Sequence, residues 1–477
     1  MDFVTPQLAV GSRAEAADGA ALQAAGIDTL LSLAPLPRPA AVPLQLSLAV
    51  ADRVPLPAAT IRETVDFLSA RIAAGHRVLM HCEMGISRSP ALAACYLHEG
   101  LGLPLDLAFA RVAAARPVAE PHAVLVESIH MHYAAGGEAV AELSGNENPF
   151  GPSPRAREAI AQALPRLHRY PASDASELRG ALADRLDLPS GQILVGNGAC
   201  DLIDLAMRAL VGAGGEVLIP DPAFPAYRSA ARRVGAEIVT VPLAGSEYSI
   251  EAYLARLSPA TRLVVVASPH NPTGTLMSPE AWARLRDALP AGAVLLLDEA
   301  YRDYVAGQPL IDAAADVRRG ASVLALRSLS KVEGLAGLRI GYGFAPEALV
   351  QRLGGLCPQY HVGSLAQAAA LAALADEEHR RDSIATNARE RELLMTGLAR
   401  LGVEFVPSAA NFVLLRGPRD AVARLAARSI AVKCMARYGL PGHIRVSVGL
   451  PADNARFLVA LGALLREDHE CRDAIPA

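Results

Sequence analysis

The sequence lacks the features that mark several specialised classes of protein. No apolar run in its 477 residues reaches the roughly 20 residues that a membrane-spanning helix needs. Its first residues, Met-Asp-Phe-Val-Thr-Pro, lack the basic and then apolar order of a signal peptide. The formal net charge of -4 gives no basis for binding nucleic acid or an anionic membrane. We therefore expect a cytoplasmic protein with no nucleic-acid or membrane partner.

The cysteines also lack a recognisable pattern. All 6 are scattered along the chain, without CxxC pairs or the spacing of a disulfide framework. We expect free thiols in a reducing cytosol and predict no metal site. What the chain does have is 52% hydrophobic and 20% charged residues, a composition typical of a globular protein. At this length it can form two or three domains.

The sequence pattern divides the chain into two parts. Residues 1–138 alternate short apolar strands with helical segments and end in the small-residue stretch Ala-Ala-Gly-Gly-Glu, which has the composition of a linker. Residues 139–477 form the second part. Within it we predict a large domain over about residues 170–375, and a small domain made of about 139–169 and 376–470.

One loop in the first part has the composition of an anion site. An expected strand, Arg77-Val-Leu-Met80, leads into His81-Cys-Glu-Met-Gly-Ile-Ser-Arg-Ser89, and a helix is expected directly afterwards. Backbone N–H groups of such a loop, with the helix N-terminus, bind anions and favour a thiolate at Cys82. Arg88 can hold two phosphate oxygens, and Ser89 can donate a hydrogen bond to the thiolate. A buried structural cysteine beside a surface arginine is the less favoured alternative.

This segment resembles the dual-specificity branch of the protein tyrosine phosphatases over about residues 1–135. The resemblance implies phosphate ester hydrolysis by Cys82, with Asp52 as the general acid that protonates the leaving alkoxide. An ordinary loop aspartate is the alternative for Asp52. The segment Arg116-Pro-Val-Ala-Glu-Pro is similar to the closing helix-to-loop region of that family. No aromatic loop that would build a deep phosphotyrosine slot is evident, so a small or aliphatic phosphate ester is at least as well supported as a phosphoprotein.

Helices and short apolar strands alternate through much of the second part. The predicted strands are 192–195, 216–219, 237–241, 262–267 and 293–297. Because helices separate strands rich in β-branched residues, we predict an α/β domain with a largely parallel sheet and helices on both faces. Ligands of such sheets lie beyond the carboxyl ends of the strands.

The stretch from Arg327 to Tyr342, Arg-Ser-Leu-Ser-Lys-Val-Glu-Gly-Leu-Ala-Gly-Leu-Arg-Ile-Gly-Tyr, contains the lysine around which the second part is organised. Lys331 lies between hydroxyl residues and a Gly-rich turn, with Arg339 eight positions later. A lysine that must condense with a cofactor aldehyde has to be held, partly shielded and placed beside an anion site. On this motif alone, a solvated loop lysine near an ion-pairing arginine is the better-supported alternative.

Other expected strand ends carry groups suited to a pyridine ring. Asp298 can keep a ring nitrogen protonated, and Asn271 and Tyr301 can both hydrogen-bond a phenolic oxygen on the ring. Phe224 can stack on the ring, although a core aromatic is an equally supported reading. The turn Gly196-Asn-Gly-Ala-Cys-Asp, between a strand and a helix, is a second possible cradle for a phosphate.

The second part resembles the fold-type I aminotransferases, and more closely their histidinol-phosphate aminotransferase branch. The motifs that carry the resemblance follow the family order over residues 143–450: Asn-Glu-Asn-Pro-Phe-Gly-Pro-Ser-Pro, Arg-Tyr-Pro, Gly-Asn-Gly, Pro-His-Asn-Pro-Thr-Gly, Asp-Glu-Ala-Tyr, Ser-Leu-Ser-Lys, Gly-Leu-Ala-Gly-Leu-Arg, Ala-Asn-Phe and Ile-Arg-Val-Ser-Val-Gly. The resemblance implies a large domain with a mostly parallel sheet, a smaller α/β domain, pyridoxal 5'-phosphate (PLP) as cofactor, and a homodimer. It also implies a phosphorylated amine or amino acid as donor and a 2-oxo acid as acceptor.

The resemblance assigns roles to residues at matching positions. The implied cofactor-binding residues are Ala199, Cys200, Phe224, Asn271, Asp298, Tyr301, Ser328, Ser330, Lys331 and Arg339, with Tyr170 reaching a phosphate across the homodimer interface. Lys331 would carry the cofactor and move the proton. The implied substrate-binding residues are Asn148, Asn411, Lys433, Arg437 and Arg445, of which Arg445, with Asn411 nearby, would bind the carboxylate of the donor.

Two departures from the family bear on the substrate. After Gly-Asn-Gly the family usually has Ser-Asp-Glu, where this chain has Ala199-Cys200-Asp201. The family's Val-Arg, whose arginine binds the substrate phosphate, is Val432-Lys433 here. A lysine supplies charge but not a planar fork, so Arg437 would have to compensate.

The leading hypothesis is a bifunctional enzyme, an aminotransferase for a phosphorylated amine such as histidinol phosphate joined to a cysteine-dependent phosphatase. One alternative is a phosphoamino-acid decarboxylase of the threonine-phosphate type with a phosphatase domain, since the stretch around Arg437 is also similar to that family. In another, the first part senses phosphate or binds a phosphoprotein without catalysis.

Overall fold

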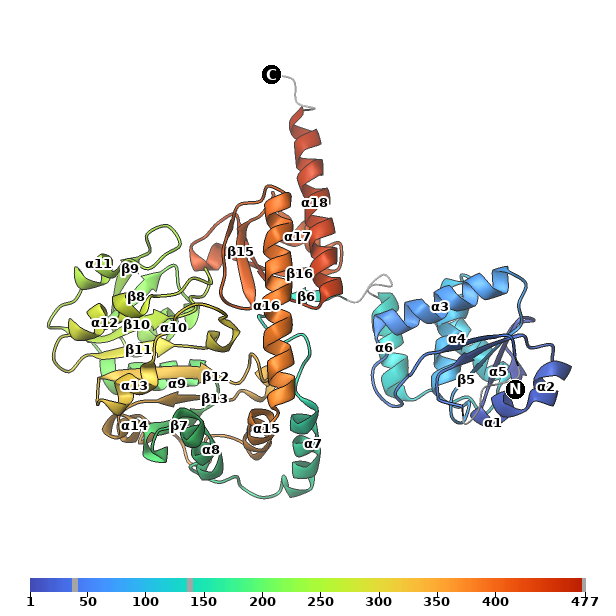
Figure 1. Ribbon diagram of the computed structural model, residues 1–477, viewed down its shortest axis with the longest axis horizontal. Helices are drawn as coiled ribbons and strands as arrows, with labels where there is room; N and C mark the ends of the chain where they lie inside the picture. The colour runs from blue at the N-terminus through green and yellow to red at the C-terminus, as the bar shows by residue number, and fades with distance from the viewer. Residues whose placement is uncertain (37–41, 135–139, 474–477) are drawn as a thin grey trace. The chain divides into compact units, whose positions relative to one another are not determined.

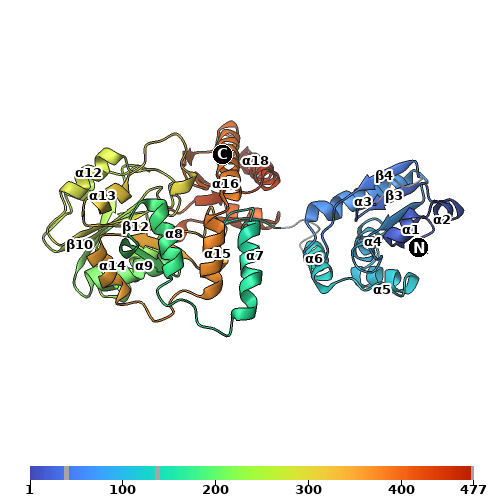
Figure 2. The ribbon, with the colours of Figure 1, turned by 60° about the horizontal axis from the view of Figure 1, so that its bottom comes forward.

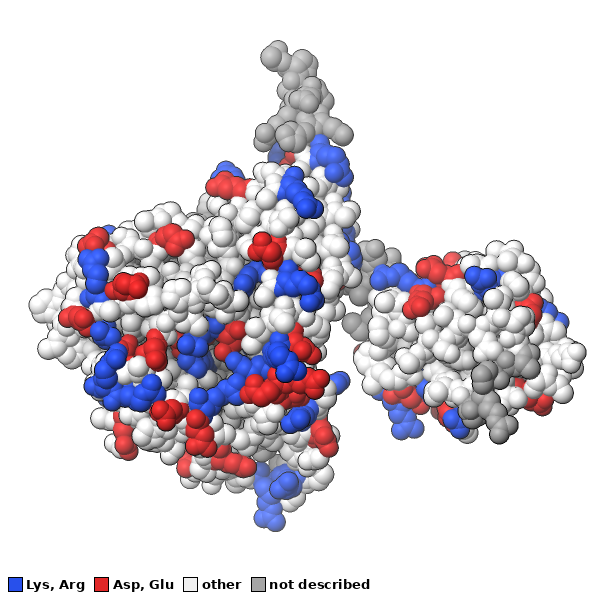
Figure 3. Space-filling view, viewed as in Figure 1, with Lys and Arg blue, Asp and Glu red and all other residues white. Residues whose placement is uncertain are grey.

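A computed structural model describes residues 1–36, 42–134 and 140–473 (Figure 1). The chain forms two compact units, Met1–Val140 and Ala141–Ala477. The predicted boundary between residues 138 and 139, with most of the predicted linker, lies outside the described residues. No helix in the described ranges is long and apolar enough to span a bilayer. On the face shown in Figure 3, basic and acidic side chains are interspersed over each unit.

The first unit is built on a sheet with strand order β1-β2-β5-β3-β4. The strands are β1 (Asp2–Phe3), β2 (Leu8–Gly11), β3 (Thr29–Ser32), β4 (Leu44–Ser47) and β5 (Val78–His81). The helices are α1 (Arg13–Ala17), α2 (Gly19–Ala24), α3 (Ala58–Ala73), α4 (Arg88–Glu99), α5 (Leu105–Ala115) and α6 (Ala123–Ala134). Every residue of the central strand β5 is buried, and β5 runs parallel to both of its neighbours. A short loop joins the carboxyl end of β5 to the N-terminus of α4.

The second unit contains a seven-stranded sheet of order β7-β13-β12-β11-β10-β8-β9. Its strands are β7 (Ile193–Gly196), β8 (Glu216–Asp221), β9 (Glu237–Pro242), β10 (Thr261–Ala267), β11 (Val294–Asp298), β12 (Val323–Ser328) and β13 (Gly341–Phe344). β13 runs antiparallel to both β12 and β7, and the other described pairings of this sheet are parallel. The predicted α/β class with a mostly parallel sheet is confirmed.

Alternation along the strands gives the large sheet two cores. In β10, Val264 and Val266 join one hydrophobic cluster, whereas Leu263 and Val265 join another. The first cluster includes side chains from α8 (Ser176–Leu186), α12 (Pro279–Asp287), α13 (Ala313–Arg318) and α15 (Ser364–Leu374). The second includes side chains from α9 (Ala199–Ala206), α10 (Pro225–Arg233) and α14 (Glu347–Gly354). Helices thus cover both faces of the sheet (Figure 2).

A smaller sheet of order β14-β15-β17-β16-β6 completes the second unit. Its strands are β6 (Ala141–Leu143), β14 (Phe405–Val406), β15 (Phe412–Arg416), β16 (Ile430–Cys434) and β17 (His443–Ser447). The remaining helices are α7 (Pro154–Ala163), α11 (Ile250–Leu254), α16 (Glu377–Arg400), α17 (Ala421–Ala426) and α18 (Pro451–Asp473). In Figure 1, α16 runs from the neighbourhood of α7 and α15 to the small sheet. The segment 139–169, predicted to belong to the small domain, is divided: β6 joins the small sheet, whereas Ala156 of α7 packs in a core of the large sheet.

Candidate active sites

The loop between β5 and α4 surrounds the sulfur of Cys82. The side chain is buried, and the Ser89 hydroxyl donates a hydrogen bond to Cys82 Sγ at 3.3 Å. Burial opposes ionisation of the thiol. The hydrogen bonds from Ser89 and from the backbone of Gly85, with the charge of Arg88, outweigh burial and lower the pKa of Cys82. This arrangement favours a thiolate facing the loop.

We expect the alkylation rate of Cys82 to show this lowered pKa. The thiolate reacts, so the rate should rise with pH and reach its plateau below the pH at which an ordinary thiol does. Ser89→Ala removes a donor to the sulfur and should move the midpoint to higher pH. Mass spectrometry after timed iodoacetamide treatment measures the rate at each cysteine. Cys95 is the internal contrast, because burial raises its pKa to about 12. A Cys82 midpoint at or above that of an ordinary thiol would contradict the expectation.

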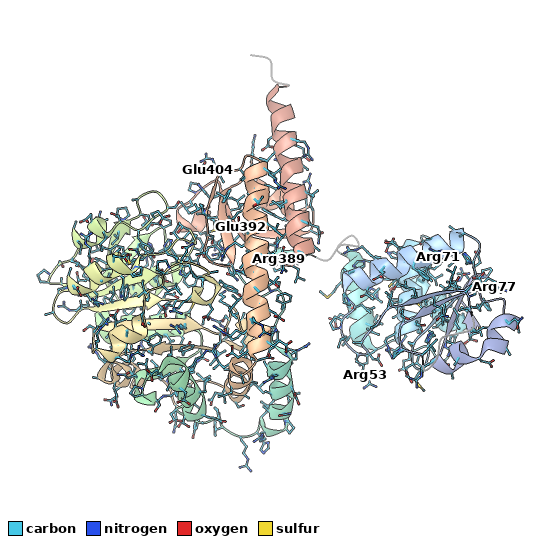
Figure 4. The ribbon with its side chains drawn as sticks, viewed as in Figure 1. Arg53, Arg71, Arg77, Arg389, Glu392 and Glu404 are labelled. Carbon is cyan, nitrogen blue, oxygen red and sulfur yellow. The ribbon has the colours of Figure 1, made fainter. Side chains whose placement is uncertain are left out.

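Asp52 and Arg88 meet at the mouth of the same site. Arg88 donates from Nη1 to the carbonyl of Val50 at 2.9 Å, and its Nε lies 3.8 Å from Asp52 Oδ1. Asp52, Cys82 and Arg88 all line a cavity of about 880 Å³. The Asp52 side chain is 45% exposed, so it can exchange a proton with a ligand in the cavity. Arg53, at the surface of this unit in Figure 4, also lines the cavity.

Two supports of the loop come from distant segments that local sequence reasoning missed. His81 Nε2 lies 2.8 Å from the hydroxyl of Ser32, which fixes the ring beneath the loop. Arg116, predicted only as part of a closing segment, donates from Nε to the carbonyl of Gly85 at 2.7 Å. A Cβ on Gly85 would lie 2.6 Å from Arg116 Nη2 and 2.7 Å from the backbone of Gly11. The close approach therefore requires glycine at this point of the loop.

In the second unit, the candidate residues gather at the carboxyl ends of the parallel strands. The cavity there has a volume of about 420 Å³. The predicted residues that line it are Ala199, Cys200, Phe224, Asn271, Asp298, Tyr301, Ser328, Ser330, Lys331, Arg339, Lys433 and Arg445. They come from β11 and β12, from the segments that follow β7, β8, β10, β11 and β12 (including the first turn of α9), and from β16 and β17 of the small sheet.

Lys331 is held at the centre of this cavity. Its Nζ donates to the carbonyl of Asn146 at 2.8 Å and lies 5.3 Å from the centre of the Tyr301 ring. Burial lowers the pKa of Lys331 to about 8, and the positive charge of Arg445 acts in the same direction. The neutral and hence nucleophilic amine is therefore a minority near pH 7, but a far larger fraction than for a solvated lysine.

Asp298 is buried at the end of β11. Burial raises the pKa of Asp298, while a hydrogen bond from the hydroxyl of Tyr227 at 2.7 Å opposes the rise. The backbone N–H of Ala300 also donates to Asp298, at 3.0 Å. A buried carboxylate beside Lys331 is stabilised by a cationic partner, such as a protonated ring nitrogen. Sequence reasoning missed Tyr227, whose only signal is its place three residues after Phe224, at the start of α10.

A network of side chains joins the large and small sheets across the cavity. Asn271 Nδ2 donates to the hydroxyl of Tyr301 at 3.3 Å, and the amide of Asn146 donates to the same hydroxyl at 3.1 Å. Arg445 donates from Nη1 to Asn271 Oδ1 at 2.7 Å and from Nη2 to the carbonyl of Ser144 at 3.1 Å. Lys433 lies directly opposite Arg445 in the antiparallel pair β16–β17. Two cations thus face the cavity from the small sheet.

The residues around Lys331 fit a phosphorylated pyridine cofactor. Gly198 has φ +80, and a Cβ there would lie 2.7 Å from Arg339 Nη2, so the guanidinium closes over the turn before α9. The hydroxyls of Ser328 and Ser330 line the same cavity. Hydroxyls, a guanidinium and a helix N-terminus form a cradle for a phosphate, and Asp298 supplies the buried acceptor for a ring cation.

Four predicted residues lie elsewhere. Asn148 donates to the carbonyl of Val332 at 2.8 Å, whereas its neighbour Asn146 lines the cavity. Asn411 donates to the carbonyl of Asn146, a residue that lines the cavity. The remaining two are Tyr170, which is 81% exposed and stacks on Tyr360, and Arg437, which lines a neighbouring cavity.

Comparison with family models divides the chain in the same two parts. Residues 138–461 match the model for aminotransferase class I and II. Residues 11–134 match the model for the catalytic domain of dual specificity phosphatases.

Curated relatives match the second part. Histidinol-phosphate aminotransferase 2 of Ralstonia nicotianae is 41% identical over 334 residues, which cover 69% of this chain and 89% of the relative. Histidinol-phosphate aminotransferase of Anaeromyxobacter sp. is 39% identical over 345 residues, which cover 71% of this chain and 94% of the relative.

Solved structures also match the second part. Histidinol-phosphate aminotransferase from Sinorhizobium meliloti, in complex with pyridoxal-5'-phosphate, superposes with a TM-score of 0.65 and 28% identity, covering 71% of this chain and 94% of that one. L-threonine-O-3-phosphate decarboxylase from Porphyromonas gingivalis superposes with a TM-score of 0.60 and 25% identity, covering 68% of this chain and 99% of that one.

Proposed function

Because the chain belongs to the class I and II aminotransferases and also carries a dual specificity phosphatase domain, we propose that it is a bifunctional enzyme. One activity transfers the amino group of a phosphorylated amine or amino acid to a 2-oxo acid, with histidinol phosphate as the first candidate donor. The other hydrolyses a phosphate monoester. The proposal rests on one observation: both units bring a nucleophile, Lys331 or Cys82, beside a phosphate cradle.

The cofactor of the second unit is PLP, which supplies an aldehyde that takes up the amino group and a ring that withdraws electrons. Lys331 would hold this cofactor and move the substrate proton. Asp298 would keep the ring nitrogen protonated, and Asn271 and Tyr301 would donate to the oxygen on the ring. The cradle formed by Ala199, Cys200, Ser328, Ser330 and Arg339 would hold the cofactor phosphate, with Phe224 against the ring.

Substrate groups would meet the residues from the small sheet. Arg445, only 4% exposed, would bind the carboxylate of an amino acid or 2-oxo acid, which a buried guanidinium can hold in bidentate fashion. Lys433 would attract a phosphate. We further propose that the enzyme is a cytoplasmic homodimer, in which the exposed Tyr170 reaches the cofactor phosphate of the partner subunit.

In the first unit, the Cys82 thiolate would attack phosphorus while Arg88 and the loop N–H groups hold the phosphate oxygens. As the S–P bond forms and the P–O bond breaks, Asp52 would protonate the leaving alkoxide. Water would then cleave the S–P bond and release phosphate. Ser89 would stabilise the thiolate that leaves in this second step.

Purified protein tests the two reactions together. We would mix it with a panel of phosphorylated amines, with and without 2-oxoglutarate, and follow transamination, phosphate release and carbon dioxide release. The absence of 2-oxo-acid-dependent turnover with every amine would overturn the aminotransferase proposal. Carbon dioxide release without an acceptor would support the second candidate, a phosphoamino-acid decarboxylase. That candidate is favoured by the similarity of the stretch around Arg437 to the threonine-phosphate decarboxylases and by the fold shared with one of them.

We expect Tyr227→Phe to weaken PLP binding. The change removes a hydrogen bond to a buried carboxylate, so the pKa of Asp298 should rise and its pairing with the ring nitrogen should weaken. A hydrogen bond to a charged group contributes about 1.5–3 kcal/mol, so the loss of affinity should be roughly 10- to 100-fold. Absorbance during cofactor titration measures it. Tyr253→Phe is the matched control, because this buried tyrosine donates instead to the carbonyl of Val265. Equal loss in the two variants would contradict the role of Tyr227.

We expect cofactor-free enzyme to take up PLP faster as the pH rises through about 8, the value to which burial lowers the pKa of Lys331. The neutral amine reacts with the aldehyde, and its fraction is small below this pH and nearly complete above it. Stopped-flow absorbance gives the rate. A rate that keeps rising to the pH at which a solvated lysine titrates would contradict the shielded setting of Lys331.

A further inference from the structure

Tyr438 lines two cavities, the one that holds Lys331 and a second of about 580 Å³. The second cavity is bounded by α10 and by a short 3-10 helix, Ala436–Tyr438. Its charged lining residues are Asp221, Arg228, Arg232, Arg233 and Arg437. Four guanidinium groups therefore converge on one concave surface with a single carboxylate.

Both α10 and the 3-10 helix contribute lining residues to each of the two cavities. In α10, Tyr227 reaches Asp298, whereas Arg228 and Arg232, four residues apart on one helical face, line the second cavity. In the 3-10 helix, the centre of the Tyr438 ring lies 6.0 Å from Cζ of the Arg445 guanidinium, whereas the preceding Arg437 lines the second cavity. The two cavities therefore adjoin at Tyr438, which lines both.

The positive charge of the second cavity is only partly compensated. Arg228 pairs with Asp221 at 2.9 Å, and Arg233 pairs with Asp204 at 2.6 Å. Within the described part of the chain, the guanidinium groups of Arg232 and Arg437 make no ion pair or hydrogen bond. Like charges held together on a concave surface repel each other, and a bound anion would relieve the repulsion.

We propose that this cavity is a subsite for a phosphate dianion. Arginine presents a planar fork that matches phosphate oxygens. A group of arginines also matches the double charge of a phosphate better than the single charge of a carboxylate ligand. The phosphate comes either from the amino donor, in which case the inference rests on the proposed aminotransferase function, or from solution as inorganic phosphate. Lys433, which lines the Lys331 cavity, supplies no guanidinium, whereas the adjoining cavity carries four.

The test compares Arg232→Gln, Arg437→Gln and the double variant with wild type, each as the PLP-loaded full chain. The first measurement is the ratio of kcat/KM for a phosphorylated amine to that for the same amine without phosphate. The second is calorimetric titration with inorganic phosphate. Arg400→Gln is the matched control, because Arg400 is an exposed arginine at the end of α16. We expect each single change to lower the ratio at least about tenfold, as for the loss of one charge-assisted hydrogen bond.

The two measurements separate the sources of the phosphate. A lower ratio together with weaker phosphate binding supports the phosphate of the donor. Weaker phosphate binding with an unchanged ratio supports free phosphate. If neither quantity changes, the subsite does not exist, whether or not the wild type transaminates a phosphorylated amine. If the wild type transaminates no such amine, the proposed function fails, while the calorimetry still decides the subsite.

A substitution that is expected to strengthen phosphate binding controls for general damage to the fold. Asp221→Asn removes the one carboxylate among the described residues that line the cavity and frees Arg228, so it should tighten phosphate binding severalfold. Weaker binding in Asp221→Asn, with cofactor absorbance and melting temperature as in wild type, would overturn the electrostatic basis of the proposal.

Discussion

Lys331→Ala is expected to lower the rate of transamination by at least about 10⁴-fold, because it removes both the covalent attachment of PLP and the group that moves the substrate proton. The chain offers an unusually clean test, since its only other lysine is Lys433. Borohydride reduction of wild type should fix one equivalent of PLP per chain, on Lys331. Peptide mass spectrometry locates the modified residue.

Lys433→Ala is the matched control for this result. Lys433 lines the same cavity but is exposed, whereas Lys331 is bonded to Asn146 and shielded. The control should still fix one equivalent of cofactor, and its change should lie in KM for the phosphorylated donor. Cofactor fixed to Lys433 in wild type would refute the role given to Lys331. Transamination that survives in Lys331→Ala would do the same.

Cys82→Ser is expected to lower hydrolysis of a small phosphate ester by at least about 10⁴-fold, because a serine hydroxyl in this loop is a far weaker nucleophile than a thiolate. Phosphate release from an aryl phosphate measures the loss. Transamination should be unchanged, since the described residues that line the Lys331 cavity all belong to the second unit.

The control for Cys82→Ser is Cys95→Ser. Cys95 is a buried thiol of α4 that bonds the carbonyl of Ala91, so its loss should leave hydrolysis near the wild-type rate. Equal hydrolysis by Cys82→Ser and wild type would show that Cys82 is not the nucleophile. If wild type binds phosphate esters without hydrolysing any, the first unit is a phosphate-sensing or phosphoprotein-binding module.

The two nucleophiles could be found from the sequence because their settings are local. Cys82, Arg88 and Ser89 lie within eight residues, in a loop and the first turn of a helix that directly follow one strand. Ser328 ends one strand, β12, and Ser330 and Lys331 follow directly after it. The parallel sheet was also predictable, because buried parallel strands are continuous apolar runs between helices. Neither β12 nor β13 was predicted as a strand. The β13 sequence Gly-Tyr-Gly-Phe has little strand propensity, and pairing on both edges compensates.

By itself, the sequence determined which chemical groups this protein has and which strand end or loop carries each of them. It predicted the two nucleophiles, their phosphate cradles and the division into two parts, because each prediction depends on residues close together in the chain. Only the tertiary structure decided what surrounds them. Tyr227 bonds Asp298 across 71 positions, Asn146 rather than Asn148 faces Lys331 across 185 positions, and Arg437 lines a neighbouring cavity with Arg232. Contacts across such separations depend on how strands and helices pack, which periodicity and local motifs do not encode.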